Sequence, residues 1–141
     1  MVATSPGPSV DFTQIKAIAV EDNTASAAMI GVIMTRLGMD ALVDHTGKNV
    51  LTMSLKIRPD IIFCDLNLPG TSGYEVIKKL REWPQLKGTL IVACSATDPH
   101  AGIPKCKAAG FDGFIAKPLT RRKFRMQVER LMTGHDVWDS R

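Results

Sequence analysis

A short apolar run ends abruptly in a carboxylate near the middle of the chain. Residues 61–64 are Ile-Ile-Phe-Cys, Asp65 follows directly, and the chain turns soon afterwards at Pro69 and Gly70. An uninterrupted apolar run bounded by turn residues is typical of a strand that is buried on both faces, as in a parallel sheet. Ligands of open α/β sheets bind at the carboxyl ends of the strands. Asp65 is therefore the first candidate for a reacting group.

Strand-like and helix-like segments alternate five times along the chain. The strand-like segments are residues 15–20, 40–46, 61–64, 89–95 and 112–116. The helix-like segments that follow them are residues 24–37, 47–57, 73–82, 101–109 and 121–132. This alternation predicts an α/β fold, a doubly wound parallel sheet of five strands with helices on both faces.

The chain has the length of one domain, and its 141 residues show no internal repeat. We expect a flexible N-terminal leader over residues 1–14, one domain over residues 15–133 and a C-terminal tail over residues 134–141. No apolar run approaches the roughly 18 residues that a membrane span needs. The N-terminus also lacks a secretory signal pattern. We therefore predict a soluble cytoplasmic domain without a membrane contact.

The basic character of the chain is concentrated in one segment. The formal net charge is +4, but residues 117–133 hold six basic side chains against the single acid Glu129. Such a segment is typical of a solvated helix face, and we expect no direct DNA binding by the domain. The sharper hypothesis is a docking face for an acidic partner at Arg121, Arg122 and Lys123.

Three cysteines, Cys64, Cys94 and Cys106, form an odd count without CxxC spacing. This pattern fits a reducing compartment. Cys64 and Cys94 each precede a candidate site residue on strands that we expect to be neighbours. We expect their side chains to point the same way, away from the site, and to pack as core thiols.

Polar side chains end four of the five predicted strands. Glu21 and Asp22 follow the first strand, Asp65 follows the third, Ser95 ends the fourth and Lys117 follows the fifth. Because the carboxyl ends of parallel strands lie at one edge of a sheet, we expect these groups to converge. Crowded carboxylates repel one another, and Mg²⁺ suits a site with one or two carboxylates, a backbone carbonyl and waters.

The Ser95 hydroxyl and the Lys117 ammonium then remain as donors for an anion such as a phosphoryl group. A nucleophilic carboxylate, a hard cation, a hydroxyl and an ammonium together form a phosphoryl-transfer site, with Asp65 as the attacking group. The plainer alternatives are a turn residue for Asp65, charges that complement a helix dipole for Glu21-Asp22, and a helix cap for Ser95.

At these residues the chain resembles the receiver domain of bacterial two-component response regulators. The resemblance rests on Glu21-Asp22, on Asp65 with Pro69 and Gly73, on Ser95-Ala96 and on Lys117-Pro118. It implies a flavodoxin-like sheet with the strand order 2-1-3-4-5.

The resemblance also implies a role for each matching residue at the acidic end of the site. Asp65 would accept a phosphoryl group from a histidine kinase or a histidine phosphotransfer protein. Mg²⁺ would be held by Asp22, Asp65 and the backbone carbonyl of Asn67, while Glu21 would act through water.

Three further residues would contact the phosphoryl group, and one would respond to it. Ser95, Lys117 and the amide of Ala96 would hold the phosphoryl oxygens. Phosphorylation would draw Ser95 inward, and Phe114 on the fifth strand would change rotamer in step. Phe114 lacks the hydroxyl of the tyrosine found in the chemotaxis regulator. Asn67 and Thr97 lie where the family tunes hydrolysis of the acyl phosphate.

The resemblance further implies an output surface on the fourth helix, the fifth strand and the fifth helix, and a homodimer through the last helix is one use of it. Autophosphorylation and autodephosphorylation would be weak, so we expect a signalling domain rather than an enzyme.

Three other functions fit parts of the pattern. A receiver fold can act unphosphorylated as a scaffold. A phosphatase with an Asp nucleophile needs a second acid two residues later, where this chain has Asn67. A flavodoxin-like cofactor binder needs a phosphate loop rich in Ser, Thr and Gly after the first strand, where this chain has Glu21-Asp22.

Overall fold

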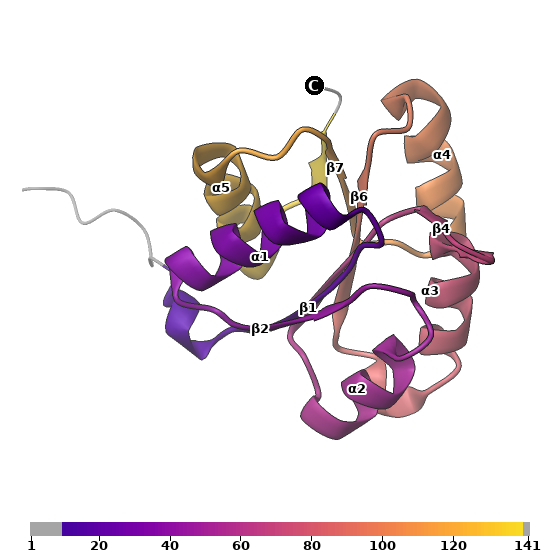
Figure 1. Cartoon of the computed structure of the whole chain (residues 1–141), viewed down its shortest axis with the longest axis horizontal. Helices are drawn as coiled ribbons and strands as arrows, with labels where there is room; N and C mark the ends of the chain where they lie inside the picture. Colours follow the sequence, from indigo (N-terminus) through magenta and orange to yellow (C-terminus); the bar gives the residue numbers. More distant parts are fainter. Residues whose placement is uncertain (1–9, 140–141) are drawn as a thin grey trace, which may run out of the picture.

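The computed structural model describes residues 10–139, which form a parallel sheet with helices on both faces (Figure 1). The strands of this sheet are β1 (Lys16–Val20), β2 (Asp40–Asp44), β3 (Ile61–Cys64), β6 (Leu90–Ser95), β7 (Gly113–Ala116) and β8 (Val137–Trp138). The α-helices of the described part are α1 (Thr24–Leu37), α2 (Val50–Ile57), α3 (Gly73–Arg81), α4 (Pro99–Ala109) and α5 (Arg121–Met132). Within residues 10–139 no helix is long and apolar enough to cross a membrane.

The observed strand order is β2-β1-β3-β6-β7-β8. The predicted α/β class is confirmed, and the predicted order 2-1-3-4-5 corresponds to β2-β1-β3-β6-β7. The predicted number of five strands is wrong, because β8 adds a sixth strand from residues that we assigned to the tail. Val137 and Trp138 pair in parallel with Gly113 and Phe114 of β7. A strand of two residues has no hydrophobic period that the sequence could reveal.

The predicted leader needs a similar correction at its C-terminal end. Residues 1–9 of that leader lie outside the described residues. Phe12–Gln14 form a 3-10 helix, η1, and the side chain of Asp11 caps it by accepting a hydrogen bond from the Thr13 amide. Phe12 is only 6% exposed and belongs to an apolar core cluster. The packed domain therefore begins before residue 15.

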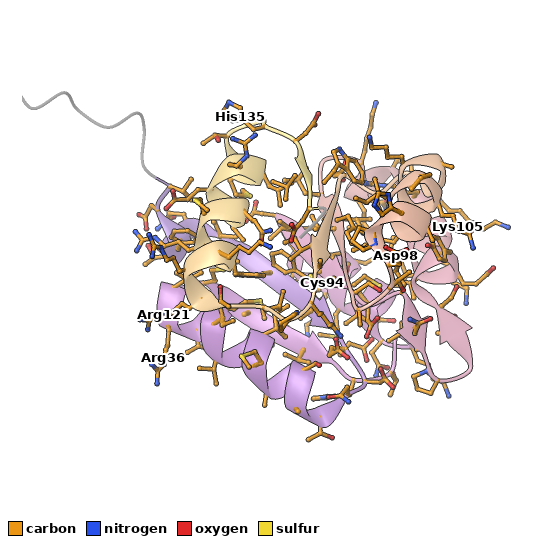
Figure 2. All side chains as sticks on the ribbon, turned by 90° about the horizontal axis from the view of Figure 1, so that it is seen from above. Arg36, Cys94, Asp98, Lys105, Arg121 and His135 are labelled. Atoms are coloured by element: carbon orange, nitrogen blue, oxygen red, sulfur yellow. The ribbon has the colours of Figure 1, made fainter. Side chains whose placement is uncertain are left out.

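Two apolar cores lie on the two faces of the sheet. Helices α1 and α5 cover one face and contribute Ile30, Ile33, Met34, Phe124, Val128 and Leu131. Helices α2, α3 and α4 cover the other face and contribute Val50, Val76, Ile77, Leu80 and Cys106. Figure 2 shows this division, with Arg121 of α5 and Lys105 of α4 on opposite sides of the sheet.

The predicted orientation of Cys64 and Cys94 is wrong. Cys64 lies in the core under α2, α3 and α4, whereas Cys94 lies in the core under α1 and α5. The cause is the strand register, which places Cys64 beside Ala93 rather than beside Cys94. A shift of one residue turns a side chain to the other face of a sheet, so these two thiols are separated by the sheet.

Most helix starts follow from the capping residues. Asn23 and Thr120 accept hydrogen bonds from backbone amides at the first turns of α1 and α5. Helix α2 begins later than predicted, at Val50. The buried carboxylate of Asp44 accepts hydrogen bonds from the amides of Thr46 and Asn49, at 3.0 and 2.9 Å, and holds the preceding residues in a turn.

A small hairpin shapes the segment that follows β3. Strands β4 (Asn67–Leu68) and β5 (Thr71–Ser72) pair antiparallel, and the chain then enters α3 at Gly73. A Cβ atom at Gly73 would lie 2.6 Å from the carbonyl oxygen of Asp65 and 2.9 Å from Cα of Leu66. Only glycine fits at this position, and its absence of a side chain lets the start of α3 pack directly against the backbone of Asp65.

Candidate functional site

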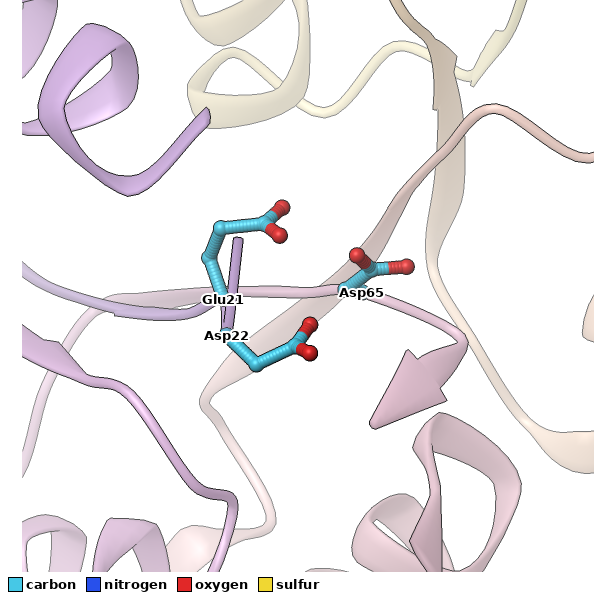
Figure 3. A group of neighbouring side chains, drawn as sticks. All are labelled: Glu21, Asp22 and Asp65. Carbon is cyan, nitrogen blue, oxygen red and sulfur yellow. The ribbon is translucent and has the colours of Figure 1, made fainter. Parts of the chain in front are cut away.

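Three carboxylates lie together at the carboxyl edge of the sheet. Glu21 and Asp22 follow β1, and Asp65 follows β3, which is the neighbour of β1 in the sheet. One carboxylate oxygen from each of the three residues lies within 4.8 Å of the others (Figure 3). Glu21 and Asp65 are buried, at 4% and 7% exposure, while Asp22 is exposed. The site is therefore a concentration of negative charge that is open to solvent on one side.

Lys117, which follows β7, lies between two of these carboxylates. Its Nζ donates a hydrogen bond to Oδ2 of Asp65 at 3.1 Å and a very short one to Oε2 of Glu21. The Lys117 side chain is 16% exposed, so solvent screens these ion pairs only weakly. Segments from three strand ends are held together by this one ammonium group.

Burial and neighbouring charges shift the pKa values of Glu21 and Lys117. Burial raises the pKa of Glu21, the hydrogen bond from Lys117 lowers it, and the charge of Asp65 raises it again, so the pKa lies above its ordinary value. Burial lowers the pKa of Lys117, but the hydrogen bonds to Glu21 and Asp65 outweigh this effect and raise the pKa above its ordinary value. Lys117 is consequently a firmly held cation at neutral pH.

The carboxylate of Asp65 is fixed at both oxygens. Oδ2 accepts the hydrogen bond from Lys117, and Oδ1 accepts one from the backbone amide of Asn67 at 3.1 Å. The side chain of Asn67 is exposed. The first residue of the β4–β5 hairpin thus orients the Asp65 carboxylate before any ligand is added.

Ser95 ends β6 and Ala96 follows it. The Ser95 side chain is hydrogen bonded to Thr97 rather than to the acids. The Ser95 hydroxyl is fully buried and donates to Oγ1 of Thr97 at 2.8 Å, while the Thr97 amide donates to Ser95 Oγ at 3.0 Å. Ala96 is exposed and lines a small apolar pocket with Lys117. The sequence interpretation missed Thr97 as the partner of Ser95. A hydroxyl two residues after a serine is the signal that could have predicted this local bond.

Phe114 lies away from the acids, in the core beneath α4. It is fully buried, and its ring lies so close to Gly102 of α4 that a Cβ atom there would be 2.9 Å from the ring carbon Cε2. The same Cβ position is 3.4 Å from Cγ2 of Thr97. Gly102 therefore leaves room for the Phe114 ring, and the Thr97 side chain lies near the same glycine.

The donor set fits a hard divalent cation. Mg²⁺ prefers oxygen ligands and few protein carboxylates, and the three acids supply carboxylate oxygens in one place. Lys117 provides one positive charge against the three carboxylates, so a net charge of −2 remains. One divalent cation would balance this charge.

A family model described as response regulator receiver domain matches residues 17–129. The chain belongs to this family. The match covers the sheet from β1 to β7 and all four segments that supply the acids, Ser95 and Lys117.

Two curated proteins illustrate where such receiver domains occur. The chain is 27% identical to the DNA-binding response regulator MtrA of Mycobacterium tuberculosis over 127 residues, which cover 90% of this chain and 54% of MtrA. It is 34% identical to the sensor histidine kinase AtsR of Burkholderia thailandensis over 130 residues, which cover 88% of this chain and 21% of AtsR. The chain thus spans about half the length of MtrA and a much smaller part of AtsR.

Solved structures agree with the receiver fold. A chemotaxis response regulator of Vibrio cholerae superimposes with a TM-score of 0.77 at 27% identity, covering 83% of this chain and 98% of that protein. The receiver domain of a sensor histidine kinase from Pseudomonas aeruginosa superimposes with a TM-score of 0.78 at 23% identity, covering 85% and 98%. The latter structure has a magnesium ion in its active-site cleft.

Proposed function

We propose that this receiver domain accepts a phosphoryl group on Asp65 from a histidine kinase or a histidine phosphotransfer protein, in a reaction that depends on Mg²⁺. The observation that carries the proposal is the position of Asp65, a buried carboxylate oriented by Asn67 and Lys117 beside two further acids. A carboxylate held in this way is available for in-line attack on phosphorus, and a fixed ammonium next to it offsets charge on the transferring group.

The proposed transfer balances without a further reactant. A carboxylate oxygen of Asp65 forms a bond to phosphorus, and the phosphorus–nitrogen bond of the phosphohistidine donor breaks. The electron pair of that bond leaves with the imidazole nitrogen, which takes up a proton from solvent. Lys117 can shift from Asp65 toward the incoming phosphoryl oxygens, because it keeps its hydrogen bond to Glu21.

The metal would be held at the solvent-facing side of the acid cluster. We assign Asp22, Asp65 and the backbone carbonyl of Asn67 as ligands, with Glu21 acting through water. An ion bound there would supply positive charge against the phosphoryl oxygens and the attacking carboxylate. The fit of the donor set and the magnesium site of the similarly folded Pseudomonas aeruginosa domain both support this assignment.

The remaining site residues would hold the product. Ser95, Lys117 and the amide of Ala96 would contact phosphoryl oxygens, with Ser95 exchanging its bond to Thr97 for one to the new group. Phe114 would respond to this exchange, since its ring and the Thr97 side chain both lie near Gly102. The output would be a change in partner binding at the face formed by α4, β7 and α5.

The wider role follows from the same proposal. The domain would be a signalling module with weak autophosphorylation rather than an enzyme, and α5 would be available for a homodimer or an acidic partner. Its exposed basic side chains are Arg121, Arg122, Arg125 and Arg130. We infer a cytoplasmic location, which the three free buried cysteines support. DNA binding belongs to the whole MtrA protein, and we propose none for this domain.

A small phosphodonor provides the test. Wild type and Asp65→Asn would be incubated with phosphoramidate and Mg²⁺, with a parallel sample in excess chelator, and intact masses recorded. We expect one phosphoryl adduct on wild type with Mg²⁺, and none on Asp65→Asn or in chelator. Asp60→Asn is a matched control, because Asp60 lies just before the other end of β3 and accepts a hydrogen bond from Lys16 at 2.9 Å. An adduct on Asp65→Asn, or none on any variant, would refute the proposal and favour a scaffold that acts without phosphorylation.

A further inference from the structure

The sixth strand covers an edge that the other five strands would leave open. Residues 137–139, which we name the C-terminal strap, run along β7 with Val137 beside Gly113 and Trp138 beside Phe114. The Asp139 amide donates a hydrogen bond to the Phe114 carbonyl at 2.8 Å. In Figure 1 the short yellow strand lies directly beside β7. The strap thus occupies backbone groups that an edge strand otherwise offers to another chain.

The side chains of the strap fasten it to both neighbouring helices. Asp139 Oδ2 forms an ion pair with Lys123 Nζ of α5 at 2.9 Å. It also accepts hydrogen bonds from Gln127 Nε2 of α5 at 3.1 Å and from the Ala116 amide of β7 at 3.2 Å. The ammonium of Lys107 on α4 lies over the face of the Trp138 ring, 5.0 Å from the ring centre. The strap therefore spans α4, β7 and α5, which together form the face where we expect output.

The strap is also placed to sense Phe114. Trp138 is the register partner of Phe114, so both side chains lie on the same face of the sheet, and both belong to the core under α4. The Phe114 ring also adjoins Gly102, and the side chain of Thr97 lies near the same glycine. Thr97 in turn is bonded to Ser95 at the end of β6. Phe114 thus lies between Trp138 on one side and, near Gly102, the Thr97 side chain that is bonded to Ser95 on the other.

The strap is a short segment at the edge of the sheet, although Val137 is buried in the core under α1 and α5 and the Asp139 side chain is only 8% exposed. It contains a two-residue strand, and Trp138 is only partly buried. The Lys123 side chain of the ion pair is 41% exposed, which weakens that contact through solvent screening. Short edge segments of this kind open at a small fraction of the global unfolding free energy.

We propose that the C-terminal strap is a release element. When Asp65 is phosphorylated, a movement of Phe114 detaches Trp138 from α4 and Asp139 from α5 and β7, and the edge of β7 is uncovered. This inference rests on the proposed phosphorylation of Asp65, but the coupling between Phe114 and the strap can be tested separately.

The first experiment follows Trp138 directly. The chain contains two tryptophans, and Trp83 is 40% exposed, so Trp83→Phe leaves Trp138 as the only tryptophan. Acrylamide quenching of the Trp138 fluorescence would be measured with Mg²⁺ alone and with Mg²⁺ plus phosphoramidate. The intact mass of the protein in the same samples would be recorded by mass spectrometry. We expect the quenching constant to roughly double as the adduct forms, since a partly buried ring moves into solvent. An adduct without a change in quenching would overturn the inference.

The second experiment moves Phe114 without phosphorylation. In the Trp83→Phe background, Gly102→Ala places a methyl group 2.9 Å from the Phe114 ring and forces the ring to shift. Gly88→Ala is the matched control, because a Cβ atom at Gly88 meets nothing within 4 Å. We expect faster quenching of Trp138 and faster exchange of the Asp139 amide in Gly102→Ala only.

These two arms separate the inference from the proposed function. If no adduct forms on wild type, the proposed function fails, and the Gly102→Ala variant alone decides whether the strap responds to Phe114. Unchanged quenching and exchange in Gly102→Ala would then overturn the release element. Asp139→Asn provides a further check, because it removes the charge that pairs with Lys123. It should raise the quenching constant of Trp138 without phosphorylation and without the Gly102→Ala substitution.

Discussion

The ammonium of Lys117 lies 3.1 Å from Oδ2 of Asp65, although 52 residues separate them in the sequence. The same ammonium is hydrogen bonded to Glu21, a further strand away. Parallel strands make this possible, because each crossover returns the chain to the same edge of the sheet. Lys117 therefore offsets part of the repulsion among the acids and at the same time orients the residue that we propose as the phosphoryl acceptor.

Removing this ammonium should destabilise the domain most strongly in the absence of Mg²⁺. Lys117→Met leaves the buried carboxylates of Glu21 and Asp65 without their partner, and loss of one member of a buried ion pair costs about 3 kcal/mol. We expect urea unfolding to show a loss of this size, which Mg²⁺ partly restores. Lys16→Met, at an exposed lysine on β1, should leave the unfolding free energy nearly unchanged. Equal losses in the two variants would contradict the account.

Magnesium should stabilise the domain through Asp22. A ligand at about 100 times its Kd adds about 2.7 kcal/mol to the unfolding free energy, and a rise in Tm reports this gain. Asp22→Ala removes an exposed carboxylate from the cluster, so we expect the rise in Tm with Mg²⁺ to disappear. Asp136→Ala, outside the cluster, should keep the full rise. A rise that persists in Asp22→Ala would show that the ion binds elsewhere.

Asp44 should make stability depend on pH in the acid range. Burial raises the pKa of its carboxyl, but hydrogen bonds from Thr46, Asn49 and Gly47 outweigh burial and bring the pKa below the ordinary value of 3.8. Because the folded pKa is the lower one, this stabilisation is fully present above pH 3.8 and is lost as the pH falls through the folded pKa.

Asp44→Asn tests the sign of this effect. The amide cannot ionise, so the variant should be less stable than wild type at neutral pH by about 1.5–3 kcal/mol, the usual contribution of a hydrogen bond to a charged group. The difference should shrink as the pH is lowered below 3.8. Urea unfolding of both proteins between neutral and acid pH measures it. A difference that grows on acidification would contradict the assigned direction.

Gly73 should tolerate no side chain. Gly73→Ala places a Cβ atom against the backbone of Asp65 and Leu66, which cannot yield as a flexible side chain would. We expect a loss of about 2–3 kcal/mol from overpacking, together with slower phosphorylation, because the Asp65 carbonyl and carboxylate must move. Gly88→Ala, which meets nothing within 4 Å, should change neither quantity. Chemical denaturation and the rate of adduct formation provide the two readouts.

Much of the fold could be predicted because the five main strands are apolar runs bounded by capping and turn residues. Asn23, Gly38 and Thr120 mark helix ends through local chemistry, and the structure uses all three. Strand β8 and helix η1 could not be predicted, since each is too short to show a period. Their place depends on tertiary contacts, such as the burial of Phe12.

The site was predictable in its composition and less so in its contacts. The positions of Glu21, Asp22, Asp65 and Lys117 at strand ends were enough to place them at one edge. The bond of Ser95 to Thr97 was missed, although a hydroxyl two residues after a serine signals such a local bond. The error on Cys64 and Cys94 has a different origin, because the relative register of two parallel strands is set by packing across the whole sheet.

Locating the phosphoryl group within the chain tests the central claim most directly. After incubation with phosphoramidate and Mg²⁺, the protein would be treated with borohydride, which reduces an aspartyl phosphate to homoserine, and then digested and sequenced by tandem mass spectrometry. The account predicts homoserine at position 65 and at no other aspartate, with none in the chelator control. Homoserine at Asp22 or elsewhere, or a stable adduct on a histidine or serine, would contradict it.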